Sequence, residues 1–144
     1  MAVLRTLARP LLASAFLSAG VQTVRRPELL APVAAPVALA IADWIPFLPR
    51  DARALVRLNG AVHVGAGGLL ALGILPRLSA LALAASLVPT TLAGHAYWRE
   101  EDAGKRMQHR VAFFANVSIL GGLLAVVSSG GSAPGPPVLK RRTG

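Results

Sequence analysis

Histidine, asparagine, arginine and tryptophan side chains stand inside or at the ends of long apolar runs, and these are the residues of this chain that could do chemistry. His63 could bind a quinone carbonyl, a metal ion or a proton, because an imidazole ring both donates and accepts hydrogen bonds. It could equally make a structural hydrogen bond to a neighbouring helix, and the same holds for Asn116. The candidate ligand-binding or partner-binding residues are Arg53, Arg57, Asn59, His63, His95, Trp98 and Asn116.

The spacing of these residues does not favour a metal centre or a catalytic site. A three-histidine metal site would need His63, His95 and His109 to converge, and no His-x-x-x-His spacing or carboxylate pair supports it. No nucleophile with its base, phosphate-binding glycine loop or dinucleotide fingerprint is seen. The chain has no cysteine, which excludes disulfides, Cys-ligated metal centres and thiol redox catalysis. We therefore expect no metal ligands, no catalytic residues and no intrinsic cofactor, with a quinone as the one ligand to consider.

The elements that must position the candidate residues are apolar runs of membrane-spanning length. No residue between Arg77 and Arg99 carries a formal charge, and a helix needs about 20 such residues to cross a bilayer. Only 15% of the 144 residues are charged, too few to solvate the outside of a soluble domain of this size. The sequence therefore predicts one integral membrane domain over residues 1–128, followed by a disordered basic tail over 129–144.

The fold class that these runs predict is all-α, an antiparallel four-helix membrane bundle. We expect spans at about 7–24, 58–75, 78–98 and 111–127, with a Pro-broken interfacial segment over 29–49 between the first two. A fifth, kinked crossing helix is the alternative for 29–49. The first run also resembles a secretory signal peptide, but its apolar stretch continues to Val24, so we expect it to be retained.

Small residues indicate how the spans pack. Ala61 and Gly65 on the second span, and Ala80 and Ala84 on the third, stand four apart on one helix face. Such pairs let helix backbones approach closely where lipid removes the hydrophobic drive between helices. We therefore expect the second and third spans to pack tightly through these pairs.

The two ends of the predicted bundle differ in the polar and charged residues that they carry. Four antiparallel spans would place all six acids and all three histidines at one end of the bundle, and this polar end is where we expect function. The net charge of +9 arises from basic residues at the ends of apolar runs, a distribution that favours lipid phosphates over nucleic acid as the partner. A count of basic residues favours termini outside, whereas the basic N-terminal flank favours termini inside, and we expect the latter.

Three ordered patches of the sequence resemble the DoxX family, over about residues 3–128. The patches run from Asn59-Gly60 through Gly67-Gly68 to Pro76-Arg77, from Pro89-Thr90-Thr91 to Trp98, and from Gln108 through Phe113–Val117 to Leu124. The resemblance implies a small bacterial protein with four crossing helices in the plasma (inner) membrane. The family takes its name from a membrane subunit associated with thiosulfate:quinone oxidoreductase, and a relative is linked to a membrane oxidoreductase complex in oxidative-stress defence. This chain has His63 where many relatives carry a glutamate about one turn before the glycine pair.

Two functions follow from the resemblance and the residues together. The first is a non-catalytic subunit or scaffold of a membrane redox complex, whose polar end contacts partner subunits or a quinone headgroup. The second is a carrier or channel for small molecules or lipids, with the polar end as its mouth. An enzyme with activity of its own is a third class, placed behind these because the catalytic constellation is missing.

Overall fold

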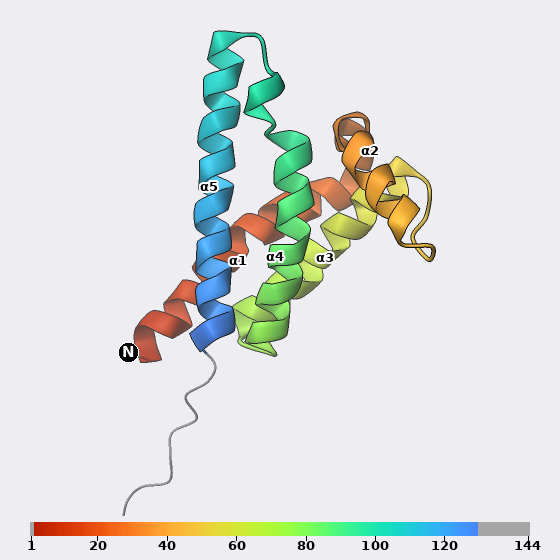
Figure 1. The fold of residues 1–144 in the computed structure, drawn as a ribbon. Coiled ribbons are helices and arrows are strands. Elements are labelled where there is room, and N and C mark those ends of the chain that lie inside the picture. Colours follow the sequence, from red (N-terminus) through yellow and green to blue (C-terminus); the bar gives the residue numbers. More distant parts are fainter. Residues whose placement is uncertain (1, 130–144) are drawn as a thin grey trace, which may run out of the picture.

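The computed structural model describes residues 2–129, and their side chains from Thr6 onward; the expected tail from Gly130 onward lies outside them. The described chain forms helices and no strand, which confirms the all-α class (Figure 1). The elements are α1 (Ala2–Arg25), α2 (Pro27–Trp44), α3 (Ala52–Leu72), α4 (Pro76–Gly94), the 3-10 helix η1 (Tyr97–Arg99) and α5 (Ala103–Ser128).

The helices α1, α3, α4 and α5 alternate in direction (Figure 1). The C-terminal ends of α1 and α4 therefore lie toward the same end of the molecule as the N-terminal ends of α3 and α5, and we call this the charged end. The opposite end, where α1 begins and α5 ends, is called the terminal end. The α1/α3 pair crosses the α4/α5 pair obliquely, and the two pairs splay apart toward the charged end.

Four helices of the described chain are long and apolar enough to cross a membrane: α2, α3, α5, and α4 extended to Arg99. The helix α1 is not among them, and it carries Arg9 and Pro10 within its length. The number of such helices equals the number of spans expected, but α2 stands where α1 was expected. The assignment of a span to 7–24 and of an interfacial position to 29–49 stays a prediction.

The segment after α1 differs from the Pro-broken structure expected of it, because α2 continues as one helix through Pro32 and Pro36. Pro27 occupies the first turn, where a missing N–H costs no hydrogen bond. Glu28, Pro32 and Pro36 follow at intervals of four on one exposed face. The two backbone hydrogen bonds that Pro32 and Pro36 cannot make therefore lie on one face of the helix. The backbone hydrogen bonds on the other faces keep α2 helical.

Aspartate caps set the starts of α3 and α5. The Asp51 carboxylate accepts a hydrogen bond from the Ala54 N–H at 2.8 Å, and Asp102 accepts one from the Lys105 N–H at 2.8 Å. Both helices therefore begin before the apolar runs expected from residues 58 and 111. As a result, the polar residues that precede each run are carried on helix rather than on loops.

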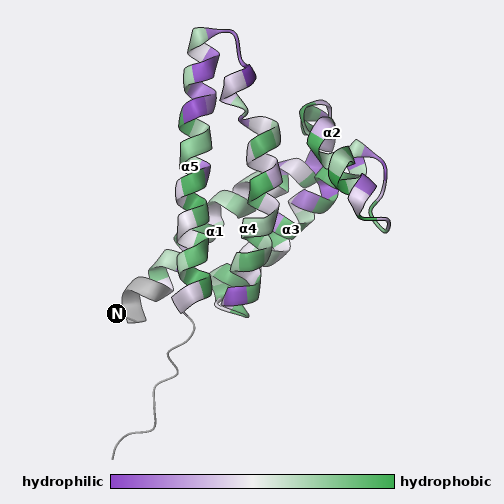
Figure 2. Cartoon of the chain, viewed as in Figure 1, coloured by the Kyte–Doolittle hydropathy of each residue, from purple (hydrophilic) through white to green (hydrophobic). Residues whose placement is uncertain are grey.

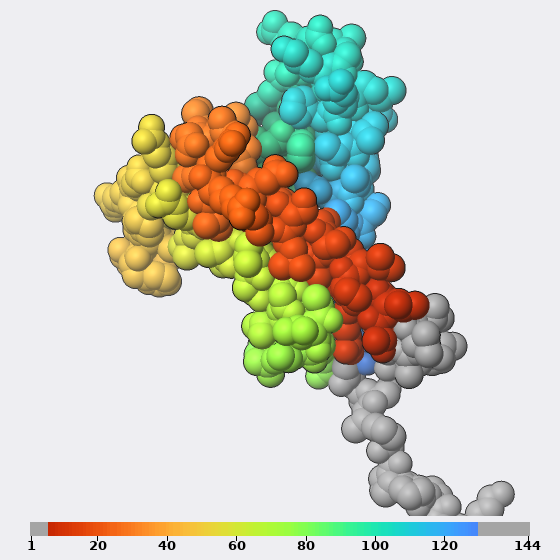
Figure 3. Space-filling view, turned by 180° about the vertical axis from the view of Figure 1, so that it is seen from behind, coloured from red at the N-terminus to blue at the C-terminus, as the bar shows by residue number. Residues whose placement is uncertain are grey.

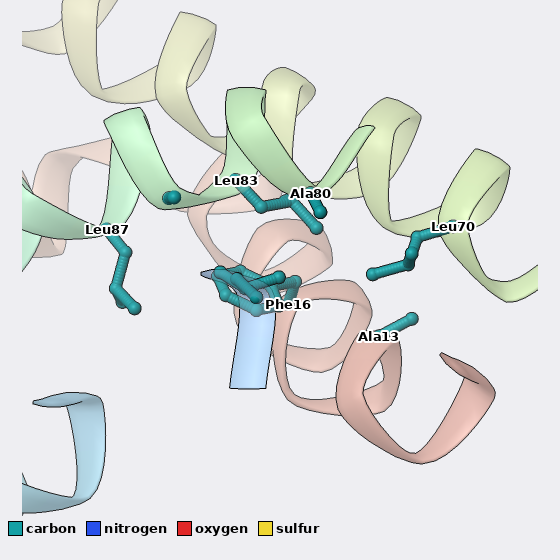
Figure 4. Packing of buried hydrophobic residues seen from close by; sticks show 8 residues of the cluster. Ala13, Phe16, Leu70, Ala80, Leu83 and Leu87 are labelled. Atoms are coloured by element: carbon teal, nitrogen blue, oxygen red, sulfur yellow. The ribbon is translucent and has the colours of Figure 1, made fainter. Parts of the chain in front are cut away.

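The core lies where the two helix pairs cross (Figure 4). Phe16 of α1 sits in the middle of the cluster, near Ala80 and Leu83 of α4, and Leu70 and Leu123 bring in α3 and α5. Leu70, Leu83 and Leu123 have no exposed surface. All four alternating helices therefore meet in one packed layer, and the hydrocarbon side chains fill it.

Glycines bring α1 and α3 into backbone contact. A Cβ atom built on Gly20 would stand 2.8 Å from the His63 Cβ and 2.9 Å from the Gly60 carbonyl oxygen, and one on Gly60 would stand 3.0 Å from the Thr23 Cβ. Figure 3 shows α1 lying diagonally across this face of the molecule, with α2 above it. No side chain larger than hydrogen fits between the two helices at these positions.

The tight packing expected through Ala61 and Gly65 was assigned to the wrong helix face. Ala61 is exposed, and a Cβ on Gly65 would meet no atom within 4 Å. Ala80 and Ala84 are buried, as expected of the third span. The small-residue face that α3 uses contains Gly60 and Gly67, seven residues apart, and it turns toward α1.

Candidate functional site

A hydrogen-bonded network joins the middle of α3, α4 and α5. The Asn59 Nδ2 of α3 donates to Thr90 Oγ1 at 3.1 Å, and Ser86 Oγ donates to Asn59 Oδ1 at 2.5 Å. On the other side of α4, Asn116 Nδ2 of α5 donates to Thr91 Oγ1 at 3.0 Å. Both functional groups of the Asn59 amide are thus used within the bundle, and the interhelical bond expected of Asn116 is present.

The candidate set taken from the sequence lacks Ser86, Thr90 and Thr91, which are the partners of these two amides. Ser86 and Thr90 stand four apart and share a helix face, which was the available signal. Each threonine hydroxyl also donates to a carbonyl one turn earlier, Thr90 to Ser86 at 2.8 Å and Thr91 to Leu87 at 2.7 Å. The hydroxyls therefore act as relays between the backbone of α4 and the amides of its neighbours.

His63 lies outside this network, in the interface between α1 and α3. The residue is 4% exposed, its ring meets the Phe16 ring edge-on at a centroid distance of 5.2 Å, and Gly20 packs against its Cβ. Neither ring nitrogen has a hydrogen-bond partner in the part of the chain that the structure describes. Leaving a buried polar group unpaired costs about 1–3 kcal/mol, so this position is destabilising unless something else binds there.

His95 and His109 form a second group at the tip of the α4–α5 hairpin. His95 follows the last turn of α4, His109 lies near the start of α5, and the ring centroids are 5.8 Å apart. The Nδ1 atom of His95 is buried without a partner among the described residues. The described residues contain no group of three or more His, Cys, Asp or Glu side chains that could hold a metal ion.

The remaining candidates face outward at the charged end. Arg53 and Arg57 are exposed on the first turns of α3, and Trp98 of η1 is 53% exposed. The Trp98 ring packs edge-on against Tyr97 at 5.2 Å and Phe113 at 5.8 Å, which fastens η1 to α5. Figure 2 shows the hydrophilic residues gathered at this tip and in the loop between α2 and α3.

We consider two cavities formed by the described residues, and His63 lines neither of them. The smaller, about 120 Å³, lies between α4 and α5 and is lined by Thr91, Phe113 and Asn116 together with aliphatic side chains. The larger, about 390 Å³, lies at the terminal end between α1, α4 and α5, and both Arg9 and Arg77 line it.

The seven candidate residues therefore fall into separate groups, and connectivity alone did not bring them together. Asn59 and Asn116 are linked through α4, His95 pairs with His109, Arg53, Arg57 and Trp98 face outward, and His63 stands apart against α1. No group combines a nucleophile with a base, so the arrangement is suited to packing and to binding at a surface.

Comparison with known proteins gives one match. A family model described as DoxX matches residues 4–96, from α1 to the turn that follows α4. No curated protein and no solved structure matches the chain. The helix α5, with Phe113 and Asn116, lies beyond the matched residues.

Proposed function

Because the chain belongs to the DoxX family and is a multi-pass membrane protein, we propose that it is a non-catalytic subunit of a membrane redox complex. In this role it docks partner oxidoreductase subunits at the charged end of its bundle. The membrane that we propose is a bacterial plasma (inner) membrane, and the physiological setting that we propose is defence against oxidative stress.

The observation that carries this proposal is the direction of the polar side chains at the charged end. Catalysis requires polar groups that converge on a reacting atom, whereas docking requires groups that project from the surface. Here the inward-facing amides Asn59 and Asn116 are occupied by hydrogen bonds between helices. The candidate residues that are exposed are Arg53, Arg57 and Trp98, and arginine and tryptophan supply much of the binding energy in protein interfaces.

The shape of the charged end supports docking as well. The α4–η1–α5 hairpin projects away from the start of α3, so the exposed basic residues are displayed on two separated arms (Figures 1 and 2). Nine of the fifteen basic residues belong to this end, and they outnumber the six acids there. A partner with an acidic surface is therefore the kind of protein that this end would attract. The basic residues concerned are Arg25, Arg26, Arg50, Arg53, Arg57, Arg99, Lys105, Arg106 and Arg110.

The ligand that we propose for the cavity between α4 and α5 is a quinone headgroup. The Phe113 ring and aliphatic side chains form most of its wall, which suits a flat apolar ring, while Thr91 and Asn116, which are hydrogen-bonded to each other, border it. At about 120 Å³ it is smaller than most ligand pockets, which measure roughly 300–1,000 Å³, so only the ring would enter. The isoprenoid chain would remain in lipid.

The alternative function, a carrier or channel, requires a continuous path between the two ends. The crossing point of the helices is filled by Leu70, Leu83 and Leu123, whose side chains have no exposed surface. The two cavities lie on different parts of the bundle and have no lining residue in common. These observations favour the subunit role over a channel.

The test is co-purification of the tagged protein from membranes of its native host. We expect the wild-type protein to recover subunits of a membrane oxidoreductase, and the Arg53→Glu/Arg57→Glu variant to recover about tenfold less, because rim charges govern association. Arg53→Lys/Arg57→Lys, which changes the same two exposed positions and keeps their charge, is the matched control and should recover the wild-type amount. Equal recovery by all three proteins, or recovery of no redox enzyme, would contradict the proposal.

A further inference from the structure

The larger cavity, at the terminal end, is built from three helices and contains both charge and apolar surface. Its volume of about 390 Å³ falls within the range of roughly 300–1,000 Å³ typical of small-molecule sites. Two arginines, Arg9 of α1 and Arg77 of α4, lie on its lining. The other lining residues are almost all apolar or small: Ala8, Leu12, Pro76, Gly122, Ala125, Val126 and Ser129.

The cavity exists because small residues face each other where α1 and α5 pass. A Cβ atom built on Gly122 would stand 3.4 Å from Leu12 Cδ1, so the hydrogen of Gly122 leaves room that a side chain would occupy. Ala8 and Ala125 continue this opening toward the surface, and both are exposed. An empty apolar hollow loses dispersion contacts along its walls, and in a membrane the molecules at hand to fill it are acyl chains.

No acidic side chain in the sequence is placed to neutralise Arg9 and Arg77. All six acids belong to the segments 28–51 and 100–102, which lie at the charged end. The Arg9 guanidinium lies beside the C-terminus of α3, since a Cβ built on Gly73, the C-cap of α3, would stand 3.0 Å from Arg9 Nη1. The negative end of a helix dipole favours a cation there, while the planar guanidinium keeps further donors for a phosphate.

The start of α4 adds a third feature that attracts an anion. Pro76 and Arg77, the first two residues of α4, both line the cavity. The residue before them, Leu75, makes no side-chain capping hydrogen bond, so the first amides of α4 have no cap. An uncapped helix N-terminus beside two arginines is a favourable place for a phosphate oxygen.

We propose that this cavity binds one anionic phospholipid, with its phosphate between Arg9, Arg77 and the start of α4. The first part of an acyl chain lies along Leu12, Gly122 and Val126, in the opening between α1 and α5. The lipid thereby bridges α1, α4 and α5 at the terminal end. This site is independent of the docking function proposed for the charged end.

The experiment is native mass spectrometry of the full-length protein released from nanodiscs that contain phosphatidylglycerol and phosphatidylcholine. We expect the wild-type protein to retain one phosphatidylglycerol molecule in preference to phosphatidylcholine. Arg9→Gln/Arg77→Gln should lower this retention about tenfold or more, because two phosphate-facing guanidinium groups are lost. The matched control is Arg99→Gln/Arg110→Gln, which removes the same charge at the charged end and should retain the lipid.

Cavity-filling variants separate a built site from simple attraction between a basic surface and anionic lipid. Gly122→Leu and Ala125→Leu keep both arginines and fill the hollow, so each should lower retention as much as the arginine variant does. Circular dichroism identifies any variant that has lost its helices, and Ala125, being exposed, provides a second variant should Gly122→Leu not fold. Wild-type retention in folded Ala125→Leu, or an equal loss in the control, would overturn the proposal.

A soluble headgroup separates a lipid from a free phosphate as the natural ligand. Glycerol 3-phosphate carries the same anion without the chain, and at millimolar concentration it should not displace the retained phosphatidylglycerol. Displacement by glycerol 3-phosphate would show that the anion alone occupies the site and would overturn the lipid assignment.

Discussion

The close approach of α1 and α3 leads to the sharpest prediction, a graded series of glycine-to-alanine variants. A Cβ atom would meet its nearest neighbour at 2.8 Å at Gly20, 3.0 Å at Gly60 and 3.4 Å at Gly67, and would meet nothing within 4 Å at Gly65. At Gly20 the contact is 0.6 Å short of the 3.4 Å at which ordinary contacts begin, and one of the obstructing atoms is the Gly60 carbonyl oxygen. Backbone cannot turn aside as a side chain can, so the helices must separate.

The magnitude follows from two opposing effects. Separating two packed helices costs about 1–3 kcal/mol, as does overpacking in other well-packed cores. Alanine in place of glycine inside a helix gains about 0.5–1 kcal/mol, because the unfolded chain has less conformational freedom to lose. Gly20→Ala should therefore be destabilised by about 1–2 kcal/mol. Gly65→Ala lies on the face of α3 that packs against no neighbour, so this variant should be slightly stabilised. Gly60→Ala and Gly67→Ala should fall between them in that order.

The assay is equilibrium unfolding in mixed micelles, in which the protein is titrated with sodium dodecyl sulfate and its helix content is followed by circular dichroism. Gly65→Ala serves as the matched control, because it makes the same chemical change without the contact. The reasoning would be refuted if Gly20→Ala were as stable as Gly65→Ala, or if the order of the four variants did not follow the distances.

Two further predictions concern polar groups inside the bundle and use the same unfolding assay. Asn59→Ala should lower the free energy of unfolding about twice as much as Asn116→Ala, because Asn59 makes two interhelical hydrogen bonds and Asn116 makes one, each worth about 0.6 kcal/mol in a membrane; equal losses would speak against the network. His63→Phe should leave the stability unchanged or raise it by about 1 kcal/mol, since it keeps a ring against Phe16 and removes two unpartnered nitrogens. A clear loss of stability in His63→Phe would contradict this expectation.

The position of His63 changes what its chemistry can be. A histidine facing α4 could have joined the network of Asn59 and Asn116, but His63 is enclosed by Phe16 and Gly20 of α1. Only 4% of its surface is exposed, so a quinone or metal would need α1 and α3 to separate before binding there. The sequence placed His63 on a span without showing which helix it faces. The prediction that His63 binds a ligand stays a prediction, and it now requires the interface between α1 and α3 to open.

Helix boundaries show how far local sequence determined the elements. The aspartates that cap α3 and α5, Asp51 and Asp102, stand before the apolar runs, and capping by aspartate is a local property. The spans expected from the sequence begin later than the helices, because they were defined by the length of each apolar run. That length measures only the part of a helix that lies in lipid. The helix α3 is longer than the span that lipid requires, and its extra first turns carry Arg53 and Arg57. These two arginines are therefore placed on rigid helix rather than on a loop.

Length, composition and the position of charges were enough to determine that this is an all-α membrane protein, whereas the DoxX family followed from the resemblance of ordered sequence patches and from the family match over residues 4–96. The reason is that a bilayer admits few structures, since every backbone polar group within it must be paired inside its own segment. The sequence could not determine which face of α3 meets which neighbour. Gly60, Gly65, Gly67 and Gly68 leave α3 smooth on more than one side, and lipid exerts no hydrophobic drive that would select one of them. That choice was made by the packing of complete helices, in which Gly20 of α1 fits against Gly60 and Leu70, Leu83 and Leu123 close the crossing point. It placed His63 against α1 and left the cavity between Arg9 and Arg77 open.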